Sequence, residues 1–455
     1  MSMIARRQKP AELFKTHLSK ANLAEIFSNH IDENASVGRD GTRVEAFKIR
    51  LDAEIVVSTR KILNGTYEFT SYKEKLISKG ANSHPRQISI PTVRDKLVLK
   101  FLSELLAKIY PDHVSRPPHQ IIKKIHEMSV TSVDDTQYLR LDIKSYYPSI
   151  DHLILMRILR RKIRQKALLT LIENALKTPT GKKKHKENEN RVGIPQGLSI
   201  SNILSSIYLH DIDTKYQQYP NINYFRFVDD ILIIGPEAEI TKLSRILPTE
   251  IRRKRKIECH EIGGSNGKSA IVSASVGIDY LGYRFCRDRI EIRNSSCKKM
   301  YSNLIKIITS MKYKGNKAPL IWRLNLRITG CKYKERRVGW LFFFAQTENM
   351  QQIKQLDAFL KKQLKGVLTP DQQLRIKTLT HAFYEIRYNF RNSKYYPDFD
   401  SFDDEQMRTQ IKVLMPSKKN EELNAMESNE LKKLFNKCIS KEIGSLEKDM
   451  LEMFS

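Results

Sequence analysis

The chain has 455 residues, 40% of them hydrophobic and 29% charged, a composition that permits a sizeable core and excludes wholesale disorder. Its 80 lysines and arginines outnumber its 51 acidic residues and give a formal net charge of +29, so we expect a polyanionic partner, nucleic acid before an anionic membrane surface. No uninterrupted apolar run reaches 18 residues, and no apolar segment follows the early arginines, so neither a membrane-spanning helix nor a secretory signal is expected.

Apolar periodicity predicts a chain in which helices and short strands alternate. In the first half it predicts, in chain order, a helix over 1–35, a Gly-Arg-Asp-Gly turn at 38–41, a helix over 44–63, β structure over 67–91, a helix over 94–110, a strand over 138–143 and a helix over 151–177. In the second half it predicts a charged loop at 181–191, a helix over 199–216, two strands within 224–234, a helix near 238–254, strands near 269–275 and 279–293, mainly helical structure from 298, a linker at 416–420 and an amphipathic tail over 421–455.

Two adjacent carboxylates, Asp229 and Asp230, lie between two apolar runs. This pattern fits a β-hairpin whose flanks are buried strands and whose turn presents the acids. Burying two carboxylates side by side is costly unless a cation compensates, and Mg²⁺ prefers oxygen ligands and substrate phosphates. Since an Asp-Asp pair in a turn is more often simply solvated, the pair by itself leaves both interpretations open.

A third acid, Asp142, ends the predicted strand over 138–143. Two-metal phosphoryl transfer needs carboxylates from separate segments to bridge ions roughly 3.5–4 Å apart. One ion activates the attacking hydroxyl, and the other neutralises the leaving pyrophosphate. The acids therefore predict such a site, with Asp142 and Asp229 as bridging ligands and Asp230 beside them.

Between these acids, residues 193–201 read Gly-Ile-Pro-Gln-Gly-Leu-Ser-Ile-Ser. Glycine and proline predict a loop, and Ser199 is suited to cap the helix that follows. Such a loop lets the backbone and the Gln196 side chain approach a base pair closely. Alone the motif is a weak turn signal, but its place between Asp142 and Asp229 strengthens it.

The order of the Asp142 segment, the Gly-Ile-Pro-Gln-Gly loop and the Phe-Val-Asp-Asp hairpin resembles the palm of reverse transcriptases. The closest resemblance is to the bacterial group that contains retron, group II intron and defence-associated enzymes. Other segments resemble further parts of that family in the same order: a Gly-x-Asp-Gly element at 38–41, fingers segments at 64–69, 86–91 and 94–96, and a primer-grip hairpin at 279–285.

The resemblance implies an α+β right-hand polymerase fold, with fingers and palm made of an antiparallel sheet plus helices and with a helical, basic thumb. The implied subdomains are an N-terminal helical extension over 1–35, fingers over 36–137, a palm with the catalytic site and primer-grip hairpin over 138–290, a basic helical thumb and connection over 291–415, and an amphipathic helical tail over 416–455.

The three acids match the family's catalytic carboxylates, and two Mg²⁺ ions are the implied cofactor. The implied metal ligands are Asp142, Ile143, Asp229 and Asp230. The usual hairpin reads Tyr-Ala-Asp-Asp, whereas here Phe227 and Val228 precede the acids. This departure keeps the acids and puts only one minor-groove contact in doubt.

The resemblance also implies residues that bind the incoming nucleotide. Lys79 and Arg86 match fingers cations that hold the triphosphate, and a point charge with a planar fork suits a polyphosphate. Tyr147 matches the aromatic residue beneath the sugar that selects deoxynucleotides. Because Tyr146 is adjacent, only one of these two rings can face the site.

Two further nucleotide contacts are implied less closely. Gln196 matches a loop residue near the template and the incoming nucleotide, and a turn-stabilising amide is the alternative. Lys268 loosely matches a lysine that assists departure of pyrophosphate, and a solvated surface charge is its alternative.

The predicted thumb is strongly basic, since residues 298–340 carry twelve lysines and arginines and one acid. Such an excess predicts contacts with a nucleic-acid backbone and strong salt dependence. The expected primer and template contacts are Gly282, Tyr283, Lys312, Arg323, Arg327, Arg336 and Arg337. Residues 418–455 are nearly neutral and poorly suited to phosphate, so this tail is expected to pack on the protein's own body, with self-association or a partner protein as the alternative.

Five cysteines without a CxxC pair and eleven scattered histidines give no zinc pattern, so free thiols in a reducing cytoplasm are expected. The resemblance implies an RNA-directed DNA polymerase whose partners are an RNA template, a DNA product and deoxynucleotides, without a membrane. The most similar class copies a dedicated non-coding RNA in bacterial antiphage defence. The open alternatives for function are a retron-type or maturase-type enzyme, template-independent or protein-primed DNA synthesis, and a non-catalytic RNA-binding scaffold. Assembly as a homo-oligomer or with a second defence protein also stays open.

Overall fold

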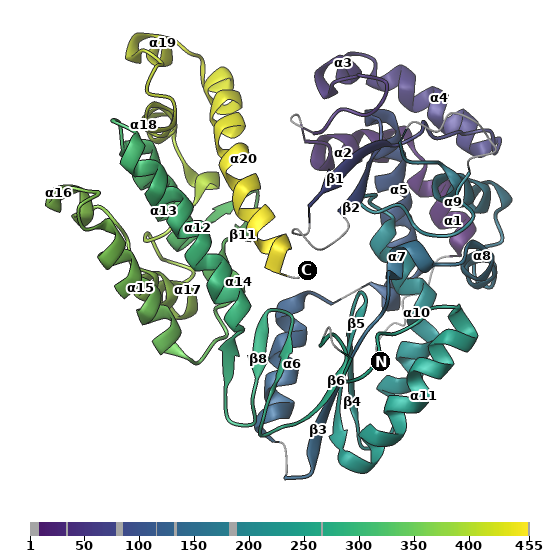
Figure 1. The fold of residues 1–455 in the computed structure, drawn as a ribbon. Helices are drawn as coiled ribbons and strands as arrows, with labels where there is room; N and C mark the ends of the chain where they lie inside the picture. The colour runs from purple at the N-terminus through teal and green to yellow at the C-terminus, as the bar shows by residue number, and fades with distance from the viewer. Residues whose placement is uncertain are drawn as a thin grey trace, which may run out of the picture. The chain divides into compact units, whose positions relative to one another are not determined.

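The structure is a computed structural model that describes residues 9–32, 35–78, 85–114, 116–131, 134–181, 189–264 and 267–453. The chain divides into two compact units. The first comprises Met1–Pro117 and Asp135–Ser273, and the second comprises Pro118–Asp134 and Ala274–Ser455. Figure 1 shows their helices and strands.

The first unit contains a four-stranded antiparallel sheet in the order β4-β5-β3-β6 and a separate hairpin of β1 and β2. Its strands are β1 (Lys73–Ile77), β2 (Arg86–Ile90), β3 (Thr136–Asp142), β4 (Asn223–Phe227), β5 (Asp230–Pro236) and β6 (Ala270–Ser273). Its helices are α1 (Pro10–His17), α2 (Lys20–His30), α3 (Val44–Ile49), α4 (Leu51–Leu63), α5 (Val93–Ile109), the 3₁₀ turn η1 (Pro111–His113), α7 (Tyr146–Ser149), α8 (His152–Arg160), α9 (Lys166–Lys177), α10 (Ser201–Gln217) and α11 (Glu237–Arg255).

The central strand β5 is buried on both faces. Ile231, Leu232 and Ile233 are fully buried, as expected of a continuous apolar run inside a covered sheet. Helix α11 packs against β3 and β5, and α10 packs against β4. These helices fix the sheet edge at which Asp142 and Asp230 lie opposite each other.

A buried carboxylate ties the start of α5 to the segment before β1. The Thr92 hydroxyl caps α5 by accepting the Asp95 backbone N–H. The fully buried Asp95 carboxylate accepts the Tyr67 hydroxyl at 2.8 Å and the Thr70 N–H at 3.0 Å. Because these donors satisfy the carboxylate, the core tolerates its charge.

The second unit is mostly helical and holds one three-stranded antiparallel sheet and one two-stranded ribbon. Its strands are β7 (Ile278–Tyr280), β8 (Tyr283–Phe285), β9 (Ile290–Ile292), β10 (Cys331–Tyr333) and β11 (Arg336–Val338). Its helices are α6 (Pro118–Val130), α12 (Asn294–Tyr313), α13 (Ala318–Thr329), α14 (Trp340–Phe343), α15 (Met350–Leu364), α16 (Pro370–Leu374), α17 (Leu379–Tyr388), the 3₁₀ turn η3 (Phe399–Ser401), α18 (Asp404–Leu414), α19 (Asn420–Asn424) and α20 (Ser428–Met453).

The C-terminal helix α20 packs on the second unit itself. Its residues Leu431, Phe435 and Ile439 are buried in a cluster with Met407 and Ile411 of α18. Figure 1 shows α20, in yellow, beside α18 and α13. The expectation that the tail packs on the protein's own body is confirmed.

The α+β fold class with antiparallel sheets is confirmed, but several predicted elements are divided. The predicted helices over 1–35, 44–63 and 151–177 each contain a break, so their described residues form the pairs α1 and α2, α3 and α4, and α8 and α9. At the first break Ser19 caps α2 by accepting the Asn22 N–H, which gives a new helix a start signal inside a continuous apolar pattern.

The two units do not coincide with the implied subdomains. Helix α6 lies within the range assigned to the fingers, yet it belongs to the second unit, and the range assigned to the palm divides after Ser273. The names fingers, palm and thumb therefore stay predictions. All five cysteines are free thiols. Among the described residues, no helix is both long and apolar enough to span a bilayer.

Candidate active site

The acidic hairpin has the predicted form. Phe227 at the end of β4 lies opposite Asp230 at the start of β5, so Val228 and Asp229 form the turn. Val228 has a φ of 57°, which is costly for a β-branched residue. The Arg226 guanidinium holds this conformation, since Nη1 donates to the Val228 carbonyl at 2.8 Å and Nε donates to Asp213 Oδ1 at 2.7 Å.

The third acid lies beside this turn. In the register of β3 with β5, Asp142 is opposite Asp230, and the next residue, Ile143, donates its N–H to the Asp229 carbonyl at 3.0 Å. Burial and the charge of Asp142 raise the pKa of Asp229 above its ordinary value. The structure thus brings the three predicted carboxylates to one edge of the sheet.

Sequence reasoning missed Arg140, which binds one of these acids directly. Its Nε donates to Asp230 Oδ1 at 2.9 Å and its Nη2 donates to Oδ2 at 2.8 Å, a bidentate pair. Burial raises the pKa of Asp230 to about 6, although Arg140 opposes this shift. The signal was strand alternation, because residues two apart on a strand, such as Arg140 and Asp142, share a face.

Two basic groups lie on the Asp142 carboxylate. His260 Nε2 is 3.2 Å and Lys268 Nζ is 3.6 Å from Asp142 Oδ1. The backbone adds to this link, since the His260 N–H donates to the Asp142 carbonyl at 2.8 Å. Burial and the nearby Lys268 charge lower the pKa of His260, which favours a neutral ring.

Lys268 was predicted as a site residue, and the structure places its side chain beside Asp142. His260 was missed, because it reaches Asp142 through the isolated bridge between Ile143 and Cys259, a pairing distant in sequence.

The neighbouring tyrosines have different environments. Tyr146 is buried and donates its hydroxyl to the Ser205 carbonyl. Tyr147 is only partly buried and donates its hydroxyl to Asn202 Oδ1 at 2.7 Å. Burial and, more weakly, the Asp229 charge raise the pKa of Tyr147 above its ordinary value. Tyr147 is therefore the more accessible of the two rings, and its place beneath the sugar stays a prediction.

The Gly-Ile-Pro-Gln-Gly loop lies against β2. A Cβ on Gly197, whose φ is 96°, would come within 2.7 Å of Ile88 Cγ2. The Gln196 carbonyl accepts the Ser89 N–H at 2.7 Å. The Gln196 backbone thus anchors the loop, while the base contact of its side chain stays a prediction.

The two predicted triphosphate cations differ in what the structure describes. Arg86 is exposed at the start of β2, and its charge lowers the pKa of Asp229 against the dominant effect of burial. Lys79 lies outside the described residues.

The predicted primer-grip turn, between β7 and β8, presents backbone rather than side chain. Gly282 has a φ of 81°, and a Cβ there would come within 3.2 Å of Phe344 Cζ. Tyr283 is fully buried and donates its hydroxyl to the Phe343 carbonyl at 2.6 Å. Any contact between Tyr283 and a primer would therefore be made by the Tyr283 backbone.

The predicted thumb cations fall into two groups. Lys312 and Arg337 are exposed, and the Arg337 guanidinium lies 4.7 Å from the centre of the Phe390 ring. By contrast, three arginines contact acceptors on α20: Arg323 pairs with Glu442, Arg327 donates to Ser445 and Arg336 pairs with Glu447. No local pattern of residues predicted that α20 lies against these arginines.

The carboxylates fit a hard divalent cation in part. Asp142 and Asp229 offer oxygen ligands, and a cation between them would relieve the repulsion that contributes to the raised pKa of Asp229. Asp230 would first have to leave Arg140. Within the described part of the chain, no group of three or more His, Cys, Asp and Glu residues is arranged to hold a metal ion.

Comparison with known proteins gives a family match over the same region. Residues 77–285 match the model of the reverse transcriptase (RNA-dependent DNA polymerase) family. The chain is similar to protein YkfC of Escherichia coli, at 22% identity over 302 residues that cover 55% of this chain and 76% of YkfC.

Two intron proteins are also similar. The chain is 28% identical to an uncharacterized 91 kDa protein in the cob intron of Schizosaccharomyces pombe, over 44% of this chain and 25% of that protein. It is 27% identical to the group II intron-encoded protein LtrA of Lactococcus lactis, over 34% of this chain and 26% of LtrA. It therefore spans only about a quarter of the length of these two proteins.

Among solved structures, telomerase from Candida albicans in complex with a TWJ fragment of telomeric RNA aligns at 14% identity with a TM-score of 0.43, over 85% of this chain and 66% of that chain. The range of the family match contains β2, the Gly193–Gly197 loop, the three acids and the β7–β8 turn. Residues 77–285, a little under half of the chain, are accordingly similar to the reverse transcriptase (RNA-dependent DNA polymerase) family.

Proposed function

We propose that this chain is an RNA-directed DNA polymerase that extends a 3′-hydroxyl with deoxynucleotides. The observation that carries the proposal is the cluster of Asp142, Asp229 and Asp230 at one sheet edge, inside the range that matches the reverse transcriptase family. A carboxylate cluster on a rigid sheet is the arrangement that metal-assisted phosphoryl transfer requires.

We propose Mg²⁺ as the metal, with Asp142 and Asp229 as its carboxylate ligands. When bound, Mg²⁺ would lower the pKa of the attacking hydroxyl and neutralise charge on the phosphates. In the reaction the 3′-oxygen bonds to the α-phosphorus, and pyrophosphate leaves. Arg86 and Lys79 would hold the triphosphate, and Tyr147 would pack beneath the sugar and exclude a 2′-hydroxyl.

Primer extension on an RNA template tests the activity. Asp142→Asn removes one ligand charge and should lower the extension rate by about a hundredfold or more. Glu261→Gln is the matched control, because it removes one negative charge from an exposed residue next to His260. Equal extension by wild type and Asp142→Asn, with both proteins folded, would refute the proposal.

For the biological role we propose that the template is a dedicated non-coding RNA and that the product acts in antiphage defence. The support is the motif resemblance to the bacterial defence-associated class. Sequencing the nucleic acids that copurify with wild type and with the double variant Asp229→Ala/Asp230→Ala tests the template. One enriched RNA with complementary DNA only in wild type is expected, together with phage protection that the double variant loses.

A second candidate role is action on intron RNA, which the intron-encoded relatives favour. In that case the copurified RNA would be an intron, and it would be retained by the double variant. DNA of low complexity without matching RNA would point instead to template-independent synthesis.

A further inference from the structure

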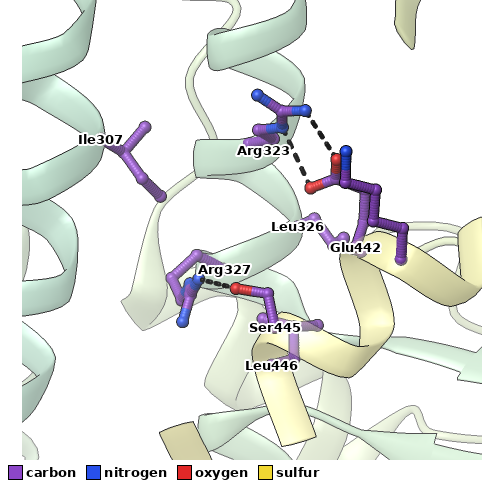
Figure 2. Close-up of a pocket in the computed structure, with 8 residues that line it drawn as sticks. Ile307, Arg323, Leu326, Arg327, Glu442, Ser445 and Leu446 are labelled. Carbon is purple, nitrogen blue, oxygen red and sulfur yellow. Dashed lines mark hydrogen bonds and ion pairs between the residues drawn. The ribbon is translucent and has the colours of Figure 1, made fainter. Parts of the chain in front are cut away.

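A pocket of about 390 Å³ with a mixed polar and apolar lining lies in the second unit, between α12, α13 and α20 (Figure 2). Its polar lining is Arg323 and Arg327 from α13 and Lys441, Glu442 and Ser445 from α20. Residues four apart on a helix share a face, so the two arginines form one wall, and Lys441 with Ser445 forms the opposite wall. Figure 2 shows both guanidiniums extending from α13 toward α20.

The pocket carries an excess of positive charge. Glu442 accepts two hydrogen bonds from Arg323, at 3.0 and 2.6 Å, and this pairing uses its one negative charge. Arg327 donates from Nη2 to the Ser445 hydroxyl at 3.2 Å, and burial lowers its pKa from the ordinary value. Three cations and one carboxylate line the pocket, so the walls keep an excess of two positive charges.

We infer that this pocket binds a phosphate-bearing ligand of nucleotide size. A guanidinium fork, an ammonium group and a hydroxyl are the donors that recognise a phosphate dianion. The volume lies at the low end of the roughly 300–1,000 Å³ of small-molecule sites, which suits a mononucleotide or free phosphate rather than a nucleic-acid strand.

The apolar part of the lining fits the same ligand. Ile307 of α12 offers an apolar wall for a sugar or base, and Leu326 and Leu446 are buried beside the charged groups. The ligand would join α13 to α20, so its binding should stabilise the docked tail. The site is independent of the three acids, which belong to the first unit.

Calorimetric titration of the full chain with inorganic phosphate, and separately with deoxyadenosine monophosphate, tests the inference. Saturable binding of one equivalent is expected, with an increase in Tm. Lys441→Gln and Arg327→Gln should each weaken binding about tenfold or more, since each removes a charged donor. Lys437→Gln is the control, because it removes the same charge from an exposed position of α20 outside the pocket, and it should change affinity less than about twofold.

The titrations are repeated with the Asp142→Asn variant in the absence of divalent cations, and binding to the pocket should persist. Failure of the polymerase proposal can therefore be distinguished from failure of this inference. Tighter binding of the nucleotide than of phosphate would identify a nucleotide ligand, and equal binding would identify free phosphate. The inference is overturned if neither probe binds saturably, or if Lys437→Gln weakens binding as much as Lys441→Gln. Because Lys441 is exposed, that variant should fold even where Arg327→Gln does not.

Discussion

At the scale of single residues, the Arg140 side chain from the same sheet binds the Asp230 carboxylate and influences its ionisation. Both of its oxygens accept hydrogen bonds from Arg140, while burial raises its pKa to about 6. The guanidinium therefore keeps the carboxyl ionised near neutral pH. It also competes with any cation for the same two oxygens.

Arg140→Gln should lower polymerase activity and shift its acidic limb toward higher pH. Without the guanidinium the pKa of Asp230 rises further, so the carboxyl becomes protonated at a higher pH, and an activity that needs the ionised form is lost sooner on acidification. Arg140→Lys should give an intermediate shift, because an ammonium cannot form the bidentate pair. The measurement is the rate of primer extension between about pH 5 and pH 8. An unchanged pH profile in Arg140→Gln would show that Asp230 has no ionised role.

Gly197→Ala should displace the loop that carries Gln196. The added Cβ would come within 2.7 Å of Ile88 Cγ2 and 3.2 Å of the Ser89 carbonyl oxygen, and φ at this position is 96°. Gly263→Ala is the matched control, since φ there is also positive at 72° but no atom lies within 4 Å of the new Cβ. Both variants bear a backbone cost of about 1–2 kcal/mol, and only Gly197→Ala adds the clash. We expect the KM for deoxynucleotide to rise about tenfold or more in Gly197→Ala alone, and equal KM values in the two variants would contradict this.

The sequence predicted those parts of the site that a few adjacent residues encode. Asp229, Asp230 and the glycines of the loop follow turn chemistry that a few adjacent residues encode. His260 needed a distant bridge to reach Asp142, and the choice between Tyr146 and Tyr147 depended on which ring the surrounding helices bury. Such contacts arise from tertiary packing, which no short pattern contains.

Helices α10 and α11 are joined by one carboxylate, a contact at the scale of elements. Glu250 of α11 accepts hydrogen bonds from Tyr216 at 2.6 Å and Lys215 at 2.7 Å on α10, and it pairs with Lys254 at 2.8 Å on its own helix. Burial opposes ionisation, but these donors lower the pKa of Glu250 from 4.5 to about 2. The ionised carboxylate therefore joins α11 to α10.

Glu250→Gln should destabilise the first unit by about 2 kcal/mol near neutral pH, after allowance for the exposure of the two lysines. Because the folded pKa is depressed, this stabilisation is present above the ordinary pKa of 4.5 and is lost as the pH falls toward about 2. The difference in unfolding free energy between the two proteins should thus shrink over that interval. Urea unfolding at several pH values measures it, and a difference independent of pH would exclude the ionised contact.

Element boundaries were less predictable than element types. The apolar spacing of residues 44–63 continues through Arg50, yet the structure ends α3 at Ile49 and begins α4 at Leu51. Periodicity indicates which face of a helix is buried, and it does not indicate a break in the helix. The amphipathic tail shows the same limit, because its pattern predicted a packed helix but not that Glu442 would pair with Arg323 and Glu447 with Arg336.

At the scale of the whole molecule, the residues behind the net charge of +29 differ in their ability to bind a polyanion. Part of the basic surplus between residues 298 and 340 is already paired inside the second unit, since Arg323 forms a bidentate pair with Glu442 and Arg336 pairs with Glu447. Exposed cations such as Lys312 keep their charge for solvent and for a polyanion. Composition alone counts both groups equally, and only the fold separates them.

This separation predicts the salt dependence of RNA binding. Each phosphate contact adds about 0.7 to the slope of log K against log salt for a single strand, because one cation displaces condensed counterions. Lys312→Gln should therefore reduce the slope by about that amount. Arg323→Gln should leave the slope nearly unchanged, because the Arg323 charge is already balanced by Glu442. The substitution would free the Glu442 carboxylate and add repulsion toward RNA, but it would remove no phosphate contact. Filter binding of a short RNA at several salt concentrations measures both slopes. If Arg323→Gln lowers the slope as much as Lys312→Gln, then α20 leaves α13 when RNA binds, and the paired arginine is part of the nucleic-acid surface after all.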